Sequence, residues 1–218
     1  MLFKTRGIVF KHFKYRDTSI IAKIFTEEFG VQTYIVNGVR SKSARGKIAL
    51  YQPLTLLDLV VYHKEGTDIN RISEIKCSNP FLSIPTDIRK TAVAMFMAEI
   101  LYKSVREEGE VKDLFEFLHS SIKIYDHLTH DFLNFHLQFM LKLSRFLGFG
   151  IESSEFLGVS HVEDDVLIRE LAKNSYEHAP QISNTIRRTL LDHIIKFYQQ
   201  HIDGLREINS VKVLQEIF

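Results

Sequence analysis

The first 80 residues alternate short apolar runs with turn residues, and this pattern limits the possible folds more than any other feature of the chain. The runs are rich in β-branched and aromatic residues, which favour strands, and glycines lie at the ends of several of them. Five runs are predicted to be strands: GIVFKHF, SIIAKIFT, VQTYIVNGV, LTLLDLVVY and INRISEIKC. A small open sheet of five short strands would expose two edges, and closure into a barrel removes them. The pattern therefore predicts an OB-type β-barrel.

The pattern changes at CSNPFLSIPTD, where Pro80 and Pro85 interrupt the strand and Thr86 or Asp87 can cap a helix. Beyond this point apolar residues recur with helical spacing, and DFLNFHLQFMLKLSRFLGFG is apolar almost all round. Other helices are predicted at TDIRKTAVAMFMAEILYKSVREE, EVKDLFEFLHSSIKIYDHL, VEDDVLIRELAKN, SNTIRRTLLDHIIKFYQQHI and SVKVLQEIF. We therefore predict an α+β protein, with an OB-fold nucleic-acid-binding domain over residues 1–80 and an α-helical bundle domain over residues 81–218.

The charge of the chain is unevenly distributed. The formal net charge is only +1, but residues 1–80 hold 13 Lys and Arg against 7 Asp and Glu, which leaves an excess of acidic residues in the remainder. Because a positive surface attracts anions, this asymmetry indicates an anionic partner for the first domain.

A basic loop, VRSKSARGKIAL, lies between the third and fourth predicted strands. More cations precede it in the sequence, and aromatic residues are interleaved with them. The predicted nucleic-acid-binding residues are Arg40, Lys42, Arg45 and Lys47 in the loop, and Lys4, Arg6, Lys11, Lys14 and Arg16 before it; the interleaved rings are Phe13, Tyr15, Tyr34 and Tyr51. Cations that neutralise phosphates and rings that stack on bases together suit a single-stranded nucleic acid. The alternative is an ordinary solvated turn.

The motifs of common enzyme classes are missing from the sequence. It contains no GxxxxGK[ST], GxGxxG, HExxH or GxSxG pattern, so we predict a protein that is not an enzyme and needs no cofactor. His127, His130 and His136 lie close in sequence, but only residues three or four apart share a helix face, and a transition-metal site usually needs three or four converging donors. We therefore predict no metal site.

The segment MLFKTRGIVF lacks the features of a signal peptide, and no stretch is long and apolar enough to predict a membrane span. The single cysteine, Cys77, excludes an internal disulfide. These observations predict a cytoplasmic protein.

The segment from TRGIVFKHF through FTEEFG to SKSARGKIALYQPLTLLDLVVY resembles the beginning of the RecO family of bacterial recombination mediators. The later FLGFG and the closing GLREINSVKVLQEI are also similar to that family, so the resemblance covers nearly the whole chain. It implies a DNA repair protein that binds single- and double-stranded DNA, anneals complementary strands, and works with RecR to load RecA onto DNA covered by single-strand-binding protein. Such a protein would act in the bacterial cytoplasm, at the nucleoid during repair.

The resemblance also implies that the helical domain binds the acidic C-terminal tail of single-strand-binding protein, which ends in phenylalanine. Such a tail needs an apolar pocket for its ring and cations for its carboxylates. Arg106, Lys142 and Arg145 are the candidate cations by composition.

The sequence departs from the family pattern in one region. Many members carry a cysteine-containing zinc module after the position of FLGFG, but residues 150–182 contain no cysteine. His161 and His178 alone are too few for a closed zinc site. We predict that this region folds by apolar packing, with Phe156, Leu157, Val166, Leu167 and Leu171 buried.

Three alternatives compete with a DNA-binding mediator. Nothing in the sequence excludes RNA, because no residue reports on recognition of a 2′-hydroxyl. The basic loop could instead meet an acidic protein in a scaffold without nucleic acid. A metal-dependent hydrolase is the third alternative.

Overall fold

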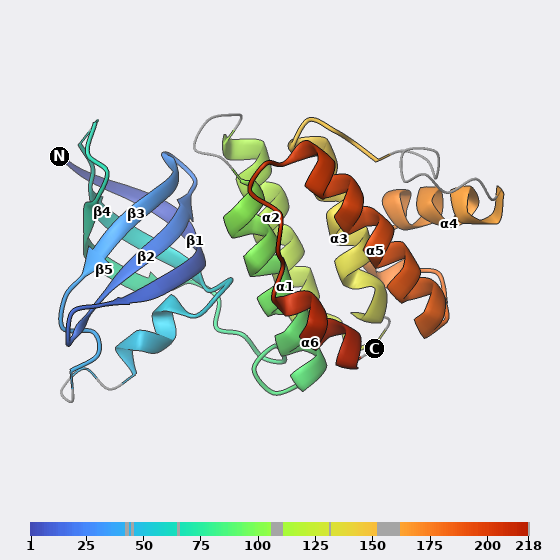
Figure 1. Ribbon diagram of the computed structural model, residues 1–218. Coiled ribbons are helices and arrows are strands. Elements are labelled where there is room, and N and C mark those ends of the chain that lie inside the picture. Colours follow the sequence, from blue (N-terminus) through green and yellow to red (C-terminus); the bar gives the residue numbers. More distant parts are fainter. Residues whose placement is uncertain are drawn as a thin grey trace. The chain divides into compact units, whose positions relative to one another are not determined.

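The computed structural model describes residues 1–41, 44, 46–64, 66–105, 111–130, 132–151 and 162–217, with the side chains of residues 162–164 left out. The chain divides into two compact units (Figure 1). The first unit comprises Met1–Leu82 and Val105–Lys123, and the second comprises Ser83–Ser104 and Ile124–Phe218. Residues 105–123 thus group with the strands, which the helical pattern of that segment does not indicate.

Five strands form the first unit: β1 (Leu2–Tyr15), β2 (Ser19–Thr26), β3 (Gly30–Val36), β4 (Leu56–Tyr62) and β5 (Asn70–Cys77). They close into a barrel in the order β1-β2-β3-β5-β4, in which only the β3–β5 pair is parallel. The predicted OB-type barrel followed by helices is therefore confirmed. β1 begins earlier than its predicted run, because residues from Leu2 to Ile8 pair with β4.

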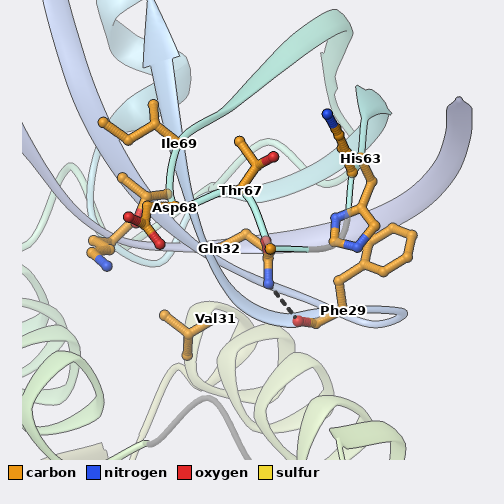
Figure 2. Close-up of a pocket in the computed structure, with 11 residues that line it drawn as sticks. Phe29, Val31, Gln32, His63, Thr67, Asp68 and Ile69 are labelled. Carbon is orange, nitrogen blue, oxygen red and sulfur yellow. Dashed lines mark hydrogen bonds between the residues drawn. The ribbon is translucent and has the colours of Figure 1, made fainter.

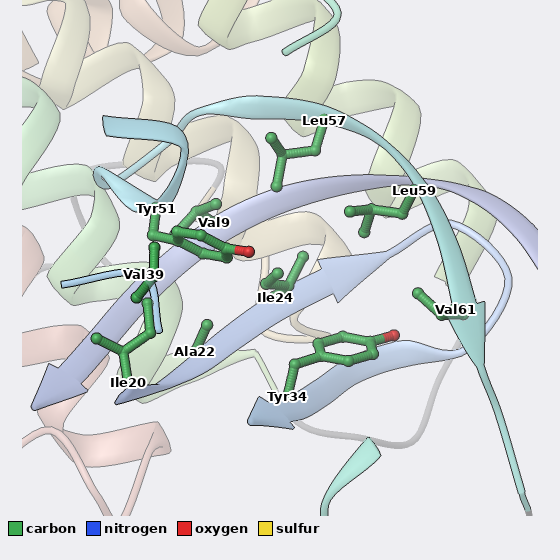
Figure 3. Packing of buried hydrophobic residues seen from close by; sticks show 10 residues of the cluster. All are labelled: Val9, Ile20, Ala22, Ile24, Tyr34, Val39, Tyr51, Leu57, Leu59 and Val61. Atoms are coloured by element: carbon green, nitrogen blue, oxygen red, sulfur yellow. The ribbon is translucent and has the colours of Figure 1, made fainter. Parts of the chain in front are cut away.

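Alternate residues of the strands fill the interior of the barrel, as Figure 3 shows. The buried cluster comprises Val9, Ile20, Ala22, Ile24, Tyr34, Val39, Tyr51, Leu57, Leu59 and Val61. Two of the interleaved aromatic residues, Tyr34 and Tyr51, lie in this core, and burial raises the pKa of Tyr51 to about 12. Both rings are therefore closed to solvent and unable to stack on a base.

A helix covers one outer face of the barrel within the first unit. Phe115 of α2 (Val111–His127) packs 5.9 Å, between ring centroids, from Phe25 of β2, which stacks on Phe10 of β1. These rings are fully buried or nearly so. α2 thus covers the outer face of the sheet at Phe10 and Phe25. The last residues of β1, up to Tyr15, extend beyond this contact.

The second unit contains α1 (Ile88–Ser104), α3 (Phe135–Phe146), α4 (Val162–Lys173), α5 (Asn184–His201) and α6 (Ser210–Ile217). α3 is buried on most sides and packs against α4 and α5, as expected of a helix that is apolar almost all round. Its C-cap is Leu147, and the next residue, Gly148, has a φ of 86°, the left-handed conformation that glycine adopts readily after a helix end. Asp87 accepts from the backbone N–H of Arg89 and so acts as one of the two predicted caps of α1. Ser183 accepts from the backbone N–H of Ile186 and caps α5 in the same way.

The prediction for the region that lacks cysteine is partly wrong. Leu171 is buried, but Val166 is 52% exposed, and Phe156 and Leu157 lie outside the described residues. The buried face of α4 instead carries Ile168, Leu171 and Ala172. Val166 turns outward because it is two residues from Ile168, and residues two apart on a helix do not share a face.

Among the helices that the structure describes, none is long and apolar enough to cross a lipid bilayer.

Candidate nucleic-acid interface

The outer face of β1, β2 and β3 carries rows of side chains that strand register brings together. Lys11 is opposite Lys23, and Lys23 is opposite Thr33. The next row contains Phe13, Ile21 and Ile35. Because directly opposed residues project to the same face of a sheet, cations and a ring lie side by side there.

Two rings on this face are open to solvent. Phe13 is 38% and Tyr15 is 37% exposed, and both lie on the part of β1 that extends beyond its pairing with β4. The Lys11 ammonium lies 5.0 Å from the centroid of the Phe13 ring, and the Arg16 guanidinium lies 5.2 Å from that of Tyr15. We call these four residues the platform. Each ring offers a face on which a base can stack, with a cation close enough to meet the adjoining phosphate.

The start of the basic loop is fixed beside the platform. The Arg40 backbone N–H donates to the Thr18 carbonyl oxygen at 3.0 Å, and its side-chain Nη1 donates to the Arg16 carbonyl oxygen at 3.3 Å. Arg16 has a φ of 53°, and its turn presents that carbonyl to Arg40. Residues 24 positions apart in the sequence therefore add their cations to one surface.

The other predicted loop cations have different outcomes. Lys47 is exposed at the start of a short 3₁₀ helix, Lys47–Tyr51, which follows Gly46. Lys42 and Arg45 lie outside the described residues. Lys14 is exposed near the end of β1.

Lys4 and Arg6 lie at the opposite end of β1. Lys4 is exposed, whereas Arg6 donates to both oxygens of Glu27 at 2.8 and 2.7 Å and also pairs with Glu116. The hydrogen bond to Glu27 holds the pKa of Arg6 above its ordinary value, and the same bond lowers the pKa of Glu27. The Arg6 charge is thus already compensated by two carboxylates.

A cavity of about 670 Å³ opens on the same barrel, between β2–β3 and the loop that joins β4 to β5 (Figure 2). Its described lining comprises Lys23, Phe29, Val31, Gln32, Thr33, His63, Lys64, Gly66, Thr67, Asp68 and Ile69. β3 pairs with β5 at Tyr34 and Ile35, and the cavity lies beside the earlier residues of β3. None of these residues was predicted as part of a site, although OB folds commonly bind ligands at strands 2 and 3 and at the loop between strands 4 and 5.

Side-chain contacts hold the walls of this cavity in place. Gln32 Nε2 donates to the Phe29 carbonyl oxygen at 2.8 Å, while Asn70 Nδ2 donates to Gln32 Oε1 at 3.1 Å. At the other end, the rings of Phe29 and His63 stack with centroids 4.0 Å apart and an interplanar angle of 14°. Phe3 meets both rings edge to face. The cavity therefore has a fixed polar wall and a fixed aromatic end.

In the second unit, Lys142 is partly sequestered. Its Nζ donates to the Asn174 carbonyl oxygen at 2.7 Å and lies 5.2 Å from the centroid of the Tyr176 ring. Burial, together with the charge of nearby Arg145, lowers the pKa of Lys142. Arg145 is exposed, and Arg106 lies outside the described residues.

A small apolar depression of about 130 Å³ lies between α4 and α5, some of whose residues are Leu167, Ile168, Ile186 and Leu190. Within the described ranges, no three His, Cys, Asp or Glu side chains gather in a group that could hold a metal ion.

The fold defines a two-part class of protein, in which a closed OB-type barrel is followed by a helical unit. Comparison with protein families is specific: the model for "Recombination protein O N terminal" matches residues 1–81, and the model for "Recombination protein O C terminal" matches residues 85–155. The chain belongs to the RecO family.

Relatives match over their full length. A protein named "DNA repair protein RecO" from Bacteroides fragilis is 37% identical over 241 residues, with 100% of each chain covered. Proteins of the same name from Phocaeicola vulgatus and Flavobacterium johnsoniae are 33% and 32% identical, again with 100% of each chain covered.

Proposed function

We propose that this chain is a DNA repair and recombination mediator without catalytic activity. It binds single- and double-stranded DNA, anneals complementary strands and, with RecR, assists RecA loading onto DNA covered by single-strand-binding protein. The observation that carries the DNA-binding part is the platform, where two exposed rings lie under cations on the outer face of an OB-type barrel. The family of the chain supports the repair role.

The platform supplies both interactions that a single strand needs. The rings of Phe13 and Tyr15 stack on bases, which contributes about 1–3 kcal/mol for each base and depends little on sequence. Lys11, Arg16 and Arg40 lie beside these rings and approach the phosphates. Single-stranded DNA therefore uses the rings and cations together, whereas double-stranded DNA, whose bases are already stacked, uses the cations alone.

Annealing follows from charge compensation and needs no catalytic group. Two strands repel each other through their phosphates, and a shared positive surface screens that repulsion. Bases held by stacking keep their hydrogen-bonding edges available for a complementary strand.

The experiment compares binding of labelled single-stranded DNA, followed by fluorescence anisotropy, for the wild type and the double variant Phe13→Ala/Tyr15→Ala. We expect affinity to fall by at least tenfold, from the loss of one or two stacked bases, while the salt dependence stays the same because the rings carry no charge. Tyr62→Ala is the matched control, since Tyr62 is an exposed ring, at 51%, on β4 of the same barrel.

Equal affinity of the double variant and the Tyr62→Ala control would contradict the proposed platform. A protein that binds no DNA at about 50 mM salt, where phosphate contacts are strong, would favour the protein-only scaffold instead. Tighter binding of a matched RNA oligonucleotide would favour the RNA-binding alternative.

For the tail of single-strand-binding protein, the depression between α4 and α5 is a better candidate than the predicted cations alone. Four of its lining side chains are apolar, beside Thr185, Thr189 and His193, whereas the Lys142 ammonium is already bound to a carbonyl oxygen. An acidic peptide that ends in phenylalanine should bind the wild type, and Ile186→Asp should weaken this binding by about tenfold or more. Val213→Asp is the control, because Val213 of α6 is as exposed as Ile186 but lies outside the depression; equal effects of the two variants would contradict this site.

A further inference from the structure

The cavity between β3 and the β4–β5 loop lies next to the platform. Lys23, which lines the cavity, is directly opposite Lys11 of the platform in the β1–β2 pairing. Opposed side chains are about 5 Å apart at Cβ, so a strand that stacks on Phe13 passes the mouth of the cavity. Its volume of about 670 Å³ lies within the range of pockets that hold small organic ligands.

The chemistry of the cavity differs from that of the platform. Figure 2 shows the stacked rings of Phe29 and His63 at one end and Asp68 at the other, with Gln32 and Thr67 between them. The amide of Gln32 is already bound to Phe29 and Asn70. Asp68 is exposed, and among the described residues its carboxylate has neither a hydrogen bond nor an ion pair.

A carboxylate beside a DNA-binding surface is unfavourable toward phosphate but suits a base. It repels phosphates, and it accepts hydrogen bonds from the exocyclic amino groups of guanine, adenine and cytosine. Thymine offers no amino group. Lys23 and Thr33, on the strand side of the same cavity, supply donors for ring nitrogens and carbonyl oxygens.

We infer that this cavity binds one nucleobase of the single strand held on the platform and selects a base with an exocyclic amino group, with Asp68 as the acceptor. The inference rests on the proposed DNA-binding function and adds selectivity to it. The platform accepts any sequence, while the cavity reads one position. The ring pair Phe29–His63 forms the apolar end against which that base lies.

The test uses the full chain and labelled oligonucleotides of about 15 nucleotides, a length that spans one OB fold. One is oligo-dT, and the others carry a single dG, dA or dC at the centre of the same tract. All have the same number of phosphates, so they differ only in base contacts. Each is measured with the wild type, with Asp68→Ala, which removes the acceptor, and with the control Asp58→Ala, which removes an exposed carboxylate of β4 outside the cavity.

We expect the wild type and Asp58→Ala to bind at least one substituted oligonucleotide about fivefold or more tighter than oligo-dT, as one well-made base contact predicts. In Asp68→Ala this preference should fall below about twofold, while oligo-dT binds as tightly as to the wild type or more tightly, because a charge that repels phosphate is lost. Equal binding of all oligonucleotides by the wild type, or a preference that survives in Asp68→Ala, would overturn the inference while the measured oligo-dT affinity upholds the proposed function. Absence of binding to every oligonucleotide would overturn both.

Discussion

The two halves of β1 use their cations in opposite ways. In the first half, Arg6 pairs with Glu27 and Glu116 and lies over the Phe115 ring, so groups of the protein itself compensate its charge. In the second half, Lys11 lies over the exposed ring of Phe13, and Arg16, which directly follows β1, lies over that of Tyr15. The contrast teaches that a cation held by two carboxylates indicates a role in the fold, whereas a cation that lies over an exposed ring indicates a candidate ligand surface.

The largest effect on stability is expected in the second unit, from a change at Glu99. Its carboxylate, like the Arg6 guanidinium, is bound by groups of the protein itself. Glu99 of α1 accepts from the backbone N–H groups of Asn209 and Ser210 at the start of α6, and it also pairs with Lys103 at 3.0 Å. Burial alone would raise the pKa of Glu99, but the hydrogen bonds from Ser210, and then those from Lys103 and Asn209, outweigh it and lower the pKa to about 2.

Because the folded-state pKa of Glu99 lies below its ordinary value, its contribution is present above about pH 4.5 and is lost as the pH falls toward 2. Glu99→Gln should lower the free energy of unfolding by roughly 3 kcal/mol at neutral pH, and the difference from the wild type should shrink below about pH 4.5. Urea unfolding followed by circular dichroism at several pH values measures this. A loss no larger than that of Glu170→Gln, an exposed glutamate of α4, would show that the Glu99 contacts add nothing.

A smaller effect on stability is expected at Arg6. This variant tests whether a cation that carboxylates already compensate contributes to the fold and not to DNA binding. Arg6→Ala removes a partly exposed ion pair and a ring contact, so the free energy of unfolding should fall by about 1–2 kcal/mol. DNA affinity should stay within about twofold of the wild type, because no phosphate contact is lost. Lys196→Ala, at an exposed position of α5, is the control and should leave both quantities unchanged. A loss of DNA affinity with unchanged stability would place Arg6 among the DNA-binding residues. The two halves of β1 would then not differ in how they use their cations.

Most of the fold could be predicted from the sequence, because strand and helix periods are local. All five strand runs and the buried helix α3 follow from patterns within a few residues. Burial of Tyr34 and Tyr51, in contrast, depends on which face of a strand or loop turns inward, and an aromatic residue between cations does not reveal this.

The site was harder to predict, because its geometry depends on residues far apart in the sequence. Arg6 and Glu116 are 110 positions apart, and no local pattern indicates that one compensates the other. The approach of Arg40 to Arg16, and that of the β4–β5 loop to β3, likewise arise only when the barrel closes. Residue type identified candidate cations, but the partners of each cation had to come from the structure.

The most direct test of the central claim is the salt dependence of single-stranded DNA binding for Lys11→Ala/Arg16→Ala/Arg40→Ala, compared with the wild type and with a charge-matched control. The control is Lys173→Ala/Lys196→Ala/Lys212→Ala, which removes three exposed lysines of α4, α5 and α6. The account predicts that the triple variant binds more weakly and that its slope of log affinity against log salt is smaller by about 2, or about 0.7 for each lost phosphate contact. The control should keep the wild-type slope. Equal slopes for the wild type and the triple variant would contradict the claim that Lys11, Arg16 and Arg40 contact DNA.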